Sequence, residues 1–397
     1  MVTNLTILFG FQKNLLFKQF LAKYQAFLIL KNLAIFIVSK KTTQMKMKKL
    51  LLVVFCSVAI HGLTTAQTDS IIKAKVLDDG SQDAEKFYNS GIANFANKNF
   101  SGALNDFNQA IALKPDFERA IYNRGTTKFE MKDFNGAIAD FDKALTINQT
   151  GDSYFSRGQA KYALGNKDGA IADYTKTVEI KVDYAQAYYY RGGIKFENAD
   201  YKGAIEDFTK AITIKPDYAY AYNDRGSAKR QMDDLKGAIS DYNKALVANS
   251  EMAFTHNNLG SAKRKQGDFK GAITDYTEAI NQKKDYYVAY NNRGSAKLDN
   301  GDFQGAIDDF SKAIQLKSDY SYAFNNRAFA KYKLKDYKGS VEDCTKAIQL
   351  NASYGYAYLN RGIAKEMLRD NAGACTDWKK AAELGVESAR NYSGDCK

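Results

Sequence analysis

Residues 287–320 read YVAYNNRGSAKLDNGDFQGAIDDFSKAIQLKSDY, and the same pattern of residue types recurs every 34 positions along most of the 397-residue chain. Counted from the start of this stretch, Gly294, Ala306, Phe310 and Ala313 stand at positions 8, 20, 24 and 27. A period of this length is typical of two antiparallel helices that cannot bury their apolar faces without neighbours. The stretch therefore predicts an all-α array of stacked helical pairs.

Alignment on the position 8 glycine gives nine units. Position 8 is glycine in every unit except the eighth, which has Ala328, and position 19 is glycine in all nine. Because a glycine inside a helix costs roughly 1 kcal/mol relative to alanine, its repetition indicates that two helices approach closely there. Both prolines of the chain, Pro115 and Pro216, stand at position 32, where they end the second helix. The units are 84–117, 118–150, 151–184, 185–218, 219–252, 253–286, 287–320, 321–354 and 355–388.

The small, small, aromatic and small residues at positions 8, 20, 24 and 27 resemble the tetratricopeptide repeat, and the resemblance covers residues 84–388. It implies a right-handed superhelical α-solenoid of helix–turn–helix units, in which the first helix of each unit (helix A) lines a concave groove and the second is helix B. Residues 389–397 are expected to cap the last repeat, since Tyr392 falls at position 4 of an unfinished tenth unit.

A secretory signal peptide is predicted at residues 45–66. The segment MKMKK from Met45 provides a basic start, an apolar run begins at Leu50, and small residues precede a cut after Ala66. The run is too short to span a membrane comfortably. We therefore expect an exported domain, periplasmic or secreted, that does not cross the membrane.

The segments on either side of this signal peptide do not show the repeat pattern. The signal peptide starts at Met45 or Met47. Residues 1–44 are therefore either the result of a start codon assigned too early or a genuine N-terminal extension with a membrane anchor. Residues 67–83 are interpreted as a linker to the repeats.

The formal charge of +12 is concentrated near the N-terminus. Residues 1–66 contain nine lysines and no acidic residue, which leaves 48 basic against 45 acidic residues in the remainder. Such a small excess is ordinary for a soluble domain and does not predict the basic surface that nucleic-acid binding requires. We therefore expect a protein or peptide partner and no nucleic acid.

Asparagine stands at position 6 of the last four repeats, at Asn258, Asn292, Asn326 and Asn360. The family superhelix turns this position into its groove, and the row is similar to the asparagine ladder of O-linked N-acetylglucosamine transferase. Because an asparagine offers both a donor and an acceptor, these side chains are expected to pair with the amides of an extended peptide. The alternative is that they bond within the array or to water.

An aromatic half of the groove is expected to run into a polar half. Position 5 is aromatic in the first four repeats, and position 12 is arginine in the fifth and sixth. The rings would take apolar side chains of a partner, and the arginines would favour acidic ones. Three alternatives remain open: the linker folds back onto the rings, the rings pack between adjacent A helices, or the groove holds a sugar chain. The aromatic residues are Tyr88, Tyr122, Phe155 and Tyr189, and the arginines are Arg230 and Arg264.

Charged residues that recur at three positions are interpreted as structural. Arginine stands at position 7 in seven repeats, lysine at position 11 in eight, and aspartate at position 23 in all nine. Opposite charges at fixed places on neighbouring helices predict ion pairs that set helix register rather than an active site.

Cysteine usage predicts one disulfide. After signal removal three cysteines remain, and an exported chain enters an oxidising compartment. Position 21 faces the next unit, so Cys375 points toward the C-terminal cap, whereas Cys344, at position 24, faces helix A of its own repeat. We predict a disulfide between Cys375 and Cys396 and a free, buried Cys344.

No pattern in the chain indicates catalysis. His256, the one histidine beyond the signal peptide, stands at position 4, a core position. The sequence has no Cys/His cluster at metal spacing, no phosphate-binding glycine loop and no nucleophile elbow. We therefore predict a non-catalytic interaction scaffold without cofactor or metal, part of an envelope complex, that binds an extended peptide or protein in its groove. The alternatives are a groove for cell-wall glycan and a structural homo-oligomer.

Overall fold

The computed structural model of the chain describes residues 81–394 and 396. The predicted N-terminal extension and signal peptide lie outside these residues, as does the linker up to residue 80. The described part contains helices α3 to α21 and no strand.

Helices α3 to α20 form nine successive pairs, each made of a helix A and a helix B. The A helices are α3 (Ser81–Ala96), α5 (Glu118–Glu130), α7 (Gly151–Ala163), α9 (Ala185–Glu197), α11 (Ala219–Gln231), α13 (Ala253–Lys265), α15 (Tyr287–Asp299), α17 (Ser321–Lys333) and α19 (Gly355–Met367). The B helices are α4 (Phe100–Leu113), α6 (Phe134–Ile147), α8 (Lys167–Ile180), α10 (Tyr201–Ile214), α12 (Leu235–Ala248), α14 (Phe269–Gln282), α16 (Phe303–Leu316), α18 (Tyr337–Leu350) and α20 (Asn371–Glu383). A short helix, α21 (Glu387–Ser393), follows the last pair.

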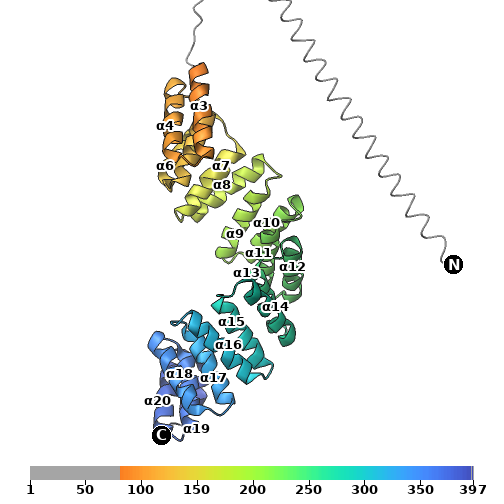
Figure 1. Cartoon of the computed structure of the whole chain (residues 1–397), viewed down its shortest axis with the longest axis vertical. Coiled ribbons are helices and arrows are strands. Elements are labelled where there is room, and N and C mark those ends of the chain that lie inside the picture. The colour runs from red at the N-terminus through yellow and green to blue at the C-terminus, as the bar shows by residue number, and fades with distance from the viewer. Residues whose placement is uncertain (1–80, 395, 397) are drawn as a thin grey trace, which may run out of the picture. The chain divides into compact units, whose positions relative to one another are not determined.

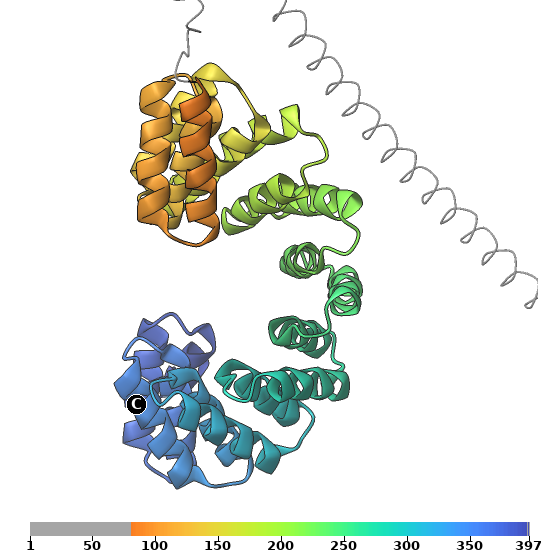
Figure 2. The same cartoon turned by 45° about the horizontal axis from the view of Figure 1, so that its top comes forward.

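The pairs stack one after another, from α3 in orange to α20 in blue (Figure 1). Each helix A packs against helix B of its own pair, and each helix B packs against helix A of the next. Successive A helices also touch, for example α13 with α15 and α17 with α19. The turned view shows the same succession (Figure 2). The predicted all-α solenoid of stacked helical pairs is confirmed.

The close approach predicted at position 8 is present in the structure. A Cβ atom on Gly294 would lie 2.8 Å from Cε1 of Phe310, the position 24 ring of the same repeat. Carbon atoms pack best about 3.5–4.0 Å apart, so the ring leaves room only for a glycine. The eighth repeat departs at both positions, because Ala328 at position 8 is combined with Cys344 at position 24. The extra methyl group is thus accompanied by a smaller partner.

Glycine at position 19 has a different cause. Helix α16 begins after Asp302, whose side chain accepts a hydrogen bond from the N–H of Gly305 at 2.9 Å. A Cβ on Gly305 would lie 2.2 Å from Oδ2 of Asp302, so any larger residue at position 19 would require the cap side chain to shift. Position 15 of the repeat, just before the cap, has a positive φ, 85° at Gly301 and 65° at Lys335. This conformation ends helix A and turns the chain into helix B.

Ion pairs link the two helices of every described pair except the first, at the positions expected from the sequence. Nε and Nη2 of Arg293 donate to both carboxylate oxygens of Asp309 at 2.9 and 2.7 Å, and Nζ of Lys297 lies 2.8 Å from the same carboxylate. Nη1 of Arg293 donates to Thr277 of the preceding helix B, so one guanidinium joins three helices. The same bidentate pairs are Arg124–Asp140, Arg157–Asp173, Arg191–Asp207, Arg225–Asp241, Arg327–Asp343 and Arg361–Asp377.

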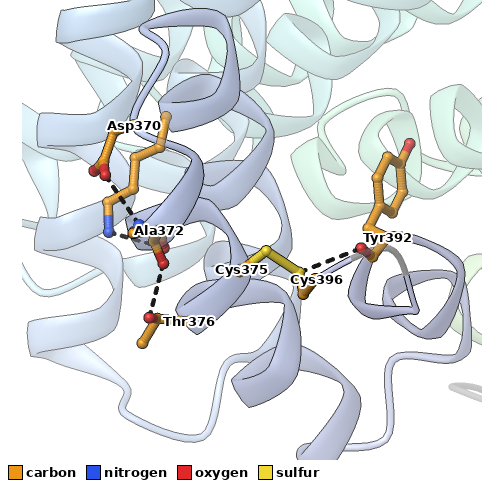
Figure 3. The surroundings of a disulfide bond; sticks show 8 residues. Asp370, Ala372, Cys375, Thr376, Tyr392 and Cys396 are labelled. Carbon is orange, nitrogen blue, oxygen red and sulfur yellow. Dashed lines mark hydrogen bonds between the residues drawn. A yellow bond between two sulfur atoms is a disulfide. The ribbon is translucent and has the colours of Figure 1, made fainter.

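Helix α21 covers the end of the last pair. Val386 and Ala389 are buried in a cluster with Trp378. The structure joins Cys375 of α20 to Cys396 by a disulfide, the pairing expected from the sequence, and Figure 3 shows this bond between α20 and the segment after α21. Cys344 is free and buried. The apolar edge of the last repeat is therefore covered by a helix that a covalent bond holds in place.

Candidate functional site

Positions 5 and 6 of helix A connect each repeat to the next. Asn291, at position 5 of α15, accepts at Oδ1 a hydrogen bond from Nδ2 of Asn326, at position 6 of α17, with a distance of 3.0 Å. We call this contact between position 5 of one repeat and position 6 of the next an A-helix joint. The joints form because successive A helices lie side by side with the same residue spacing.

The chemistry of the joints changes along the array. In the first, second and fourth joints a tyrosine hydroxyl occupies position 5, whereas the last four joints use two asparagines. The third joint has no hydrogen bond and brings the rings of Phe155 and Tyr190 to a centroid distance of 5.7 Å. The hydrogen-bonded joints are Tyr88–Asn123 (3.2 Å), Tyr122–Ser156 (3.0 Å), Tyr189–Asp224 (2.8 Å), Asn223–Asn258 (3.2 Å), Asn257–Asn292 (2.9 Å), Asn291–Asn326 (3.0 Å) and Asn325–Asn360 (2.9 Å).

The asparagines expected to hold a peptide backbone therefore bond first within the array. Asn258, Asn292, Asn326 and Asn360 each donate one amide hydrogen to a position 5 asparagine, and all four are half-buried. An asparagine carries two N–H donors and an oxygen with two lone pairs, so each side chain keeps a second donor. Any contact with a peptide is restricted to these remaining groups.

All four position 5 aromatic residues contribute to contacts between repeats, and three of them line neither of the cavities described below. Phe155 is 8% exposed, and its ring centroid lies 4.9 Å from that of Tyr184. Tyr88 and Tyr122 are half-buried and take part in the joints described above. None of these three residues lines the cavities described next, whereas Tyr189 does. For these three rings the structure agrees with the alternative that they pack between adjacent A helices.

A cavity of about 640 Å³ opens between the A helices of repeats 3 to 6. It lies where position 5 changes from Tyr189 to Asn223 and position 12 changes from Phe196 to Arg230. The smaller amide leaves open the space that a ring occupies in earlier repeats. Gly193, at position 9, adds to this space, because a Cβ built on it would have no neighbour within 4 Å.

Polar groups converge on this cavity. The Tyr189 hydroxyl and Nδ2 of Asn223 each donate to the carboxylate of Asp224, both at 2.8 Å. Burial raises the pKa of Asp224, and these two hydrogen bonds oppose the shift. Among the described residues Arg230 forms no ion pair, and its Nε is buried without a hydrogen-bond partner. The cavity thus combines aromatic rings, the carboxylates of Asp224 and Glu197, and the guanidinium of Arg230, which forms an ion pair with neither of them.

Arg230 also borders a second cavity, of about 370 Å³, that continues along the A helices. Arg264 and Asn292 line this cavity, but Nε of Arg264 lies 2.6 Å from Oδ2 of Asp299. The charge of Arg264 is therefore offset within the array. The aromatic and polar halves of the groove meet at Arg230, the one residue that lines both cavities.

Sequence reasoning missed two residues of this site, Gly193 and Asp224. Both differ from every other repeat at the same position: Gly193 is the only glycine at position 9, and Asp224 is the only aspartate at position 6 and directly precedes the run of four asparagines. These departures at groove positions were the available signal. Conversely, Asn326 and Asn360 line neither of the two cavities.

Two negative findings apply to residues 81–394 and 396. No group of three His, Cys, Asp or Glu side chains there is placed to hold a metal ion. No helix in this part of the chain is both long and apolar enough to cross a membrane. The A helices present aromatic rings, amides and the unpaired guanidinium of Arg230.

Comparison with known proteins gives repeat models and solved structures. Models described as tetratricopeptide repeat match residues 118–150, 155–219, 219–251 and 287–320, and one described as TPR repeat matches 260–301. A search of curated protein sequences found no match.

Three solved structures illustrate the likeness. A crystal structure of MamA is 26% identical and covers 43% of this chain and 93% of its own, with a TM-score of 0.41. YrrB, described as a TPR protein with an unusual peptide-binding site, is 21% identical over 46% of this chain and 95% of its own, also with a TM-score of 0.41. The APC/C hetero-tetramer Cut9–Hcn1 is 16% identical over 74% of this chain and 59% of its own, with a TM-score of 0.51.

The last of these structures supports the fold, and the repeat models support the family. The described residues form nine helical pairs, the position 8 glycines lie close to the position 24 rings, and the matched repeat models describe the same repeat. This chain is a tetratricopeptide repeat protein.

Proposed function

We propose that this protein is a non-catalytic scaffold that binds an extended segment of a partner protein along its A helices, with an apolar side chain of the partner in the 640 Å³ cavity. Tetratricopeptide repeat proteins are typically protein-interaction scaffolds, and the family is generally non-catalytic. The observation that carries the proposal is the cavity itself, which lies on the A-helix surface and combines aromatic rings with the unpaired Arg230.

Each part of the site has a role in this proposal. The rings of Tyr189 and Phe196 provide apolar surface, and burying one apolar side chain there would contribute about 1.5–3 kcal/mol. Arg230 favours an acidic residue in the partner next to that side chain. The remaining amide donors of Asn258 and Asn292 bond to the partner's backbone, which makes this part of the recognition independent of sequence.

We propose further that the protein is exported and belongs to an envelope complex. The signal-like segment at residues 45–66 supports export, and the Cys375–Cys396 disulfide suits an oxidising compartment. N-terminal sequencing of the protein from a periplasmic or secreted fraction should find a mature chain that begins at Gln67. A cytoplasmic protein that keeps Met45 would exclude export.

Filling the cavity tests the binding proposal directly. Gly193→Leu places a side chain into open space, so the variant should fold as the wild type does, and losing a helical glycine should add about 1 kcal/mol of stability. Peptides selected from a random library on the wild-type protein should combine an apolar residue with an acidic one. Their affinity should fall about tenfold or more in the variant, since 1.4 kcal/mol corresponds to a factor of ten.

Thr126→Leu is the matched control, because Thr126 occupies position 9 of the second repeat, outside the cavity. This variant should bind the selected peptides with unchanged affinity. Equal affinities in the wild type and Gly193→Leu would exclude the cavity as the binding site. Retention of cell-wall glycan that is lost in Gly193→Leu, without any peptide selection, would favour the glycan alternative. Self-association in light scattering without a partner would favour the homo-oligomer.

A further inference from the structure

The sixth repeat differs from the others at three positions around one carboxylate. Position 4 is His256 rather than an aromatic residue, position 7 is Leu259 rather than arginine, and position 26 is Glu278 rather than lysine, while Asp275 is kept at position 23. Position 26 is lysine in seven repeats, at Lys143, Lys176, Lys210, Lys244, Lys312, Lys346 and Lys380. The sixth repeat thus loses two positive charges and gains a negative one in the same region.

A regular repeat shows what these positions normally do. In the seventh repeat the guanidinium of Arg293 lies 5.6 Å from the centroid of the Tyr290 ring and donates two hydrogen bonds to Asp309. A cation held between an aromatic face and a bidentate carboxylate is a stable arrangement. Six repeats therefore contain a guanidinium site with both an aromatic ring and a carboxylate that the chain itself fills, and a seventh, around Arg124, has the carboxylate with Ile121 in place of the ring.

In the sixth repeat the chain does not fill this site. The side chain of Leu259 is buried in an apolar cluster with Ala238, Tyr242 and Ala262. The carboxylate of Asp275 is left with Nζ of Lys263, 2.7 Å from its Oδ2, as its one ion-pair partner among the described residues.

A cavity lies beside this carboxylate. Its volume is about 420 Å³, far above the roughly 10–15 Å³ that a single water requires. Asp275, which is 8% exposed, and Glu278 line it together with His256, whose Nδ1 is buried without a hydrogen-bond partner. Burial also raises the pKa of Asp275, and its interaction with Lys263 opposes this shift.

The first repeat, which also lacks arginine at position 7, shows no such vacancy. There Ser90 and Asn94 both donate to Asp106 at 2.7 Å, so the position 23 carboxylate has two neutral donors instead. The sixth repeat, by contrast, combines the buried carboxylate of Asp275, the second carboxylate of Glu278 and an adjoining cavity. This cavity shares no lining residue with either of the two groove cavities.

We propose that this cavity in the sixth repeat binds a guanidinium group supplied from outside the chain. Asp275 accepts hydrogen bonds from it as Asp309 accepts them from Arg293, Glu278 adds a second negative charge, and the His256 ring takes the place of the stacked tyrosine. The group belongs either to an arginine side chain of a partner protein or to a small guanidinium compound. This site is separate from the A-helix groove and does not depend on the proposed function.

Nuclear magnetic resonance of the full-length protein can test this proposal, because the chain has only two histidines and the imidazole signals of His256 are readily assigned. Titration with methylguanidinium chloride should shift these signals with a dissociation constant on the order of 1 mM. Methylammonium chloride, which lacks the planar fork of donors, should shift them at least fivefold less at equal concentration. A short arginine-containing peptide distinguishes the sources: a shift equal to that with methylguanidinium indicates a partner's arginine, and no shift indicates a small compound.

Two variants provide the decisive comparison. Leu259→Arg restores the residue of seven other repeats and should fill the site from within, and Asp275→Asn removes the charge without changing the size of the side chain. Both should abolish the shift, whereas Glu342→Gln, an exposed carboxylate on α18, should leave it unchanged. A shift that persists in Asp275→Asn, an equal response to methylammonium, or no shift in the wild type would overturn the proposal.

Discussion

Replacing Cys344 by phenylalanine should destabilise the eighth repeat, and adding Ala328→Gly should restore it. In the repeats with glycine at position 8, a Cβ atom would lie between 2.4 and 3.0 Å from the position 24 ring. The eighth repeat is the only one with alanine there, and Cys344 is 0% exposed, so an introduced ring has no outward path. The ring and the Ala328 methyl group would have to move apart by about 0.5–1 Å to reach normal contact distance.

The size of each effect follows from these distances. Overpacking of this kind costs about 1–3 kcal/mol, which is the expected loss in Cys344→Phe. Ala328→Gly alone should cost about 1 kcal/mol through helix propensity. If the two changes were independent, the double variant would lose roughly 2–4 kcal/mol. Because the double variant recreates the glycine and ring of the other repeats, we expect a stability close to that of the wild type.

Hydrogen exchange read by mass spectrometry is the appropriate assay, because a long repeat array need not unfold in one step. A local loss of about 2 kcal/mol in Cys344→Phe should speed exchange in α17 and α18 roughly thirtyfold and leave α3 to α8 unchanged. Exchange in the double variant should return to within a few fold of the wild-type rate. If the losses of stability in the two single variants simply add in the double variant, positions 8 and 24 are not coupled, and the close contact between them does not explain the choice of residues.

Three further predictions concern other parts of the array. Cys396→Ser removes a disulfide between residues 21 positions apart and should cost up to about 3 kcal/mol, seen as faster exchange confined to α21 and its contacts. Burial raises the pKa of Asp275 above its usual 3.8, so the stability gained from protonating this carboxyl is fully present below pH 3.8 and is lost as pH rises through the folded-state pKa. Asp275→Asn should therefore flatten the pH dependence of hydrogen exchange in α14 over this range, and an unchanged pH dependence would contradict the assignment. Burial raises the pKa of the Cys344 thiol to about 12, so iodoacetamide at pH 8 should modify it only after unfolding, as peptide mapping can show.

Much of the fold could be predicted because the contacts that determine it join residues within a single repeat. The position 8 glycine contacts the position 24 ring of the same repeat, and the position 19 glycine contacts the cap residue three positions before it. The Arg293–Asp309 pair likewise lies within one repeat. Because these contacts join residues of the same repeat, they recur every 34 residues, and the same residue types appear at the same positions in most of the nine repeats. The disulfide was predictable for a related reason, since position 21 packs toward the following element, as Ile138 and Ile239 do and as Cys375 does at the C-terminal cap.

The candidate site was less predictable because it depends on differences between repeats. The asparagine row was expected to face a partner, but Asn258 and Asn292 each give one amide hydrogen to the preceding helix A, and that contact depends on how closely two A helices pack. The charge of Arg264 is likewise offset by Asp299 of the next repeat, whereas that of Arg230 is not.

The amino-acid sequence by itself determined the all-α repeat, the helix pairing and the structural role of the recurring charges, because these follow from spacing within one unit. Only the tertiary structure decided which side chains are left without a partner. A cavity forms where neighbouring repeats differ in side-chain size, as at Tyr189 and Asn223, and an unpaired carboxylate arises where one repeat lacks a residue that the others have, as at Leu259. Such vacancies depend on the distances between packed helices, which the spacing of residues along the chain does not specify.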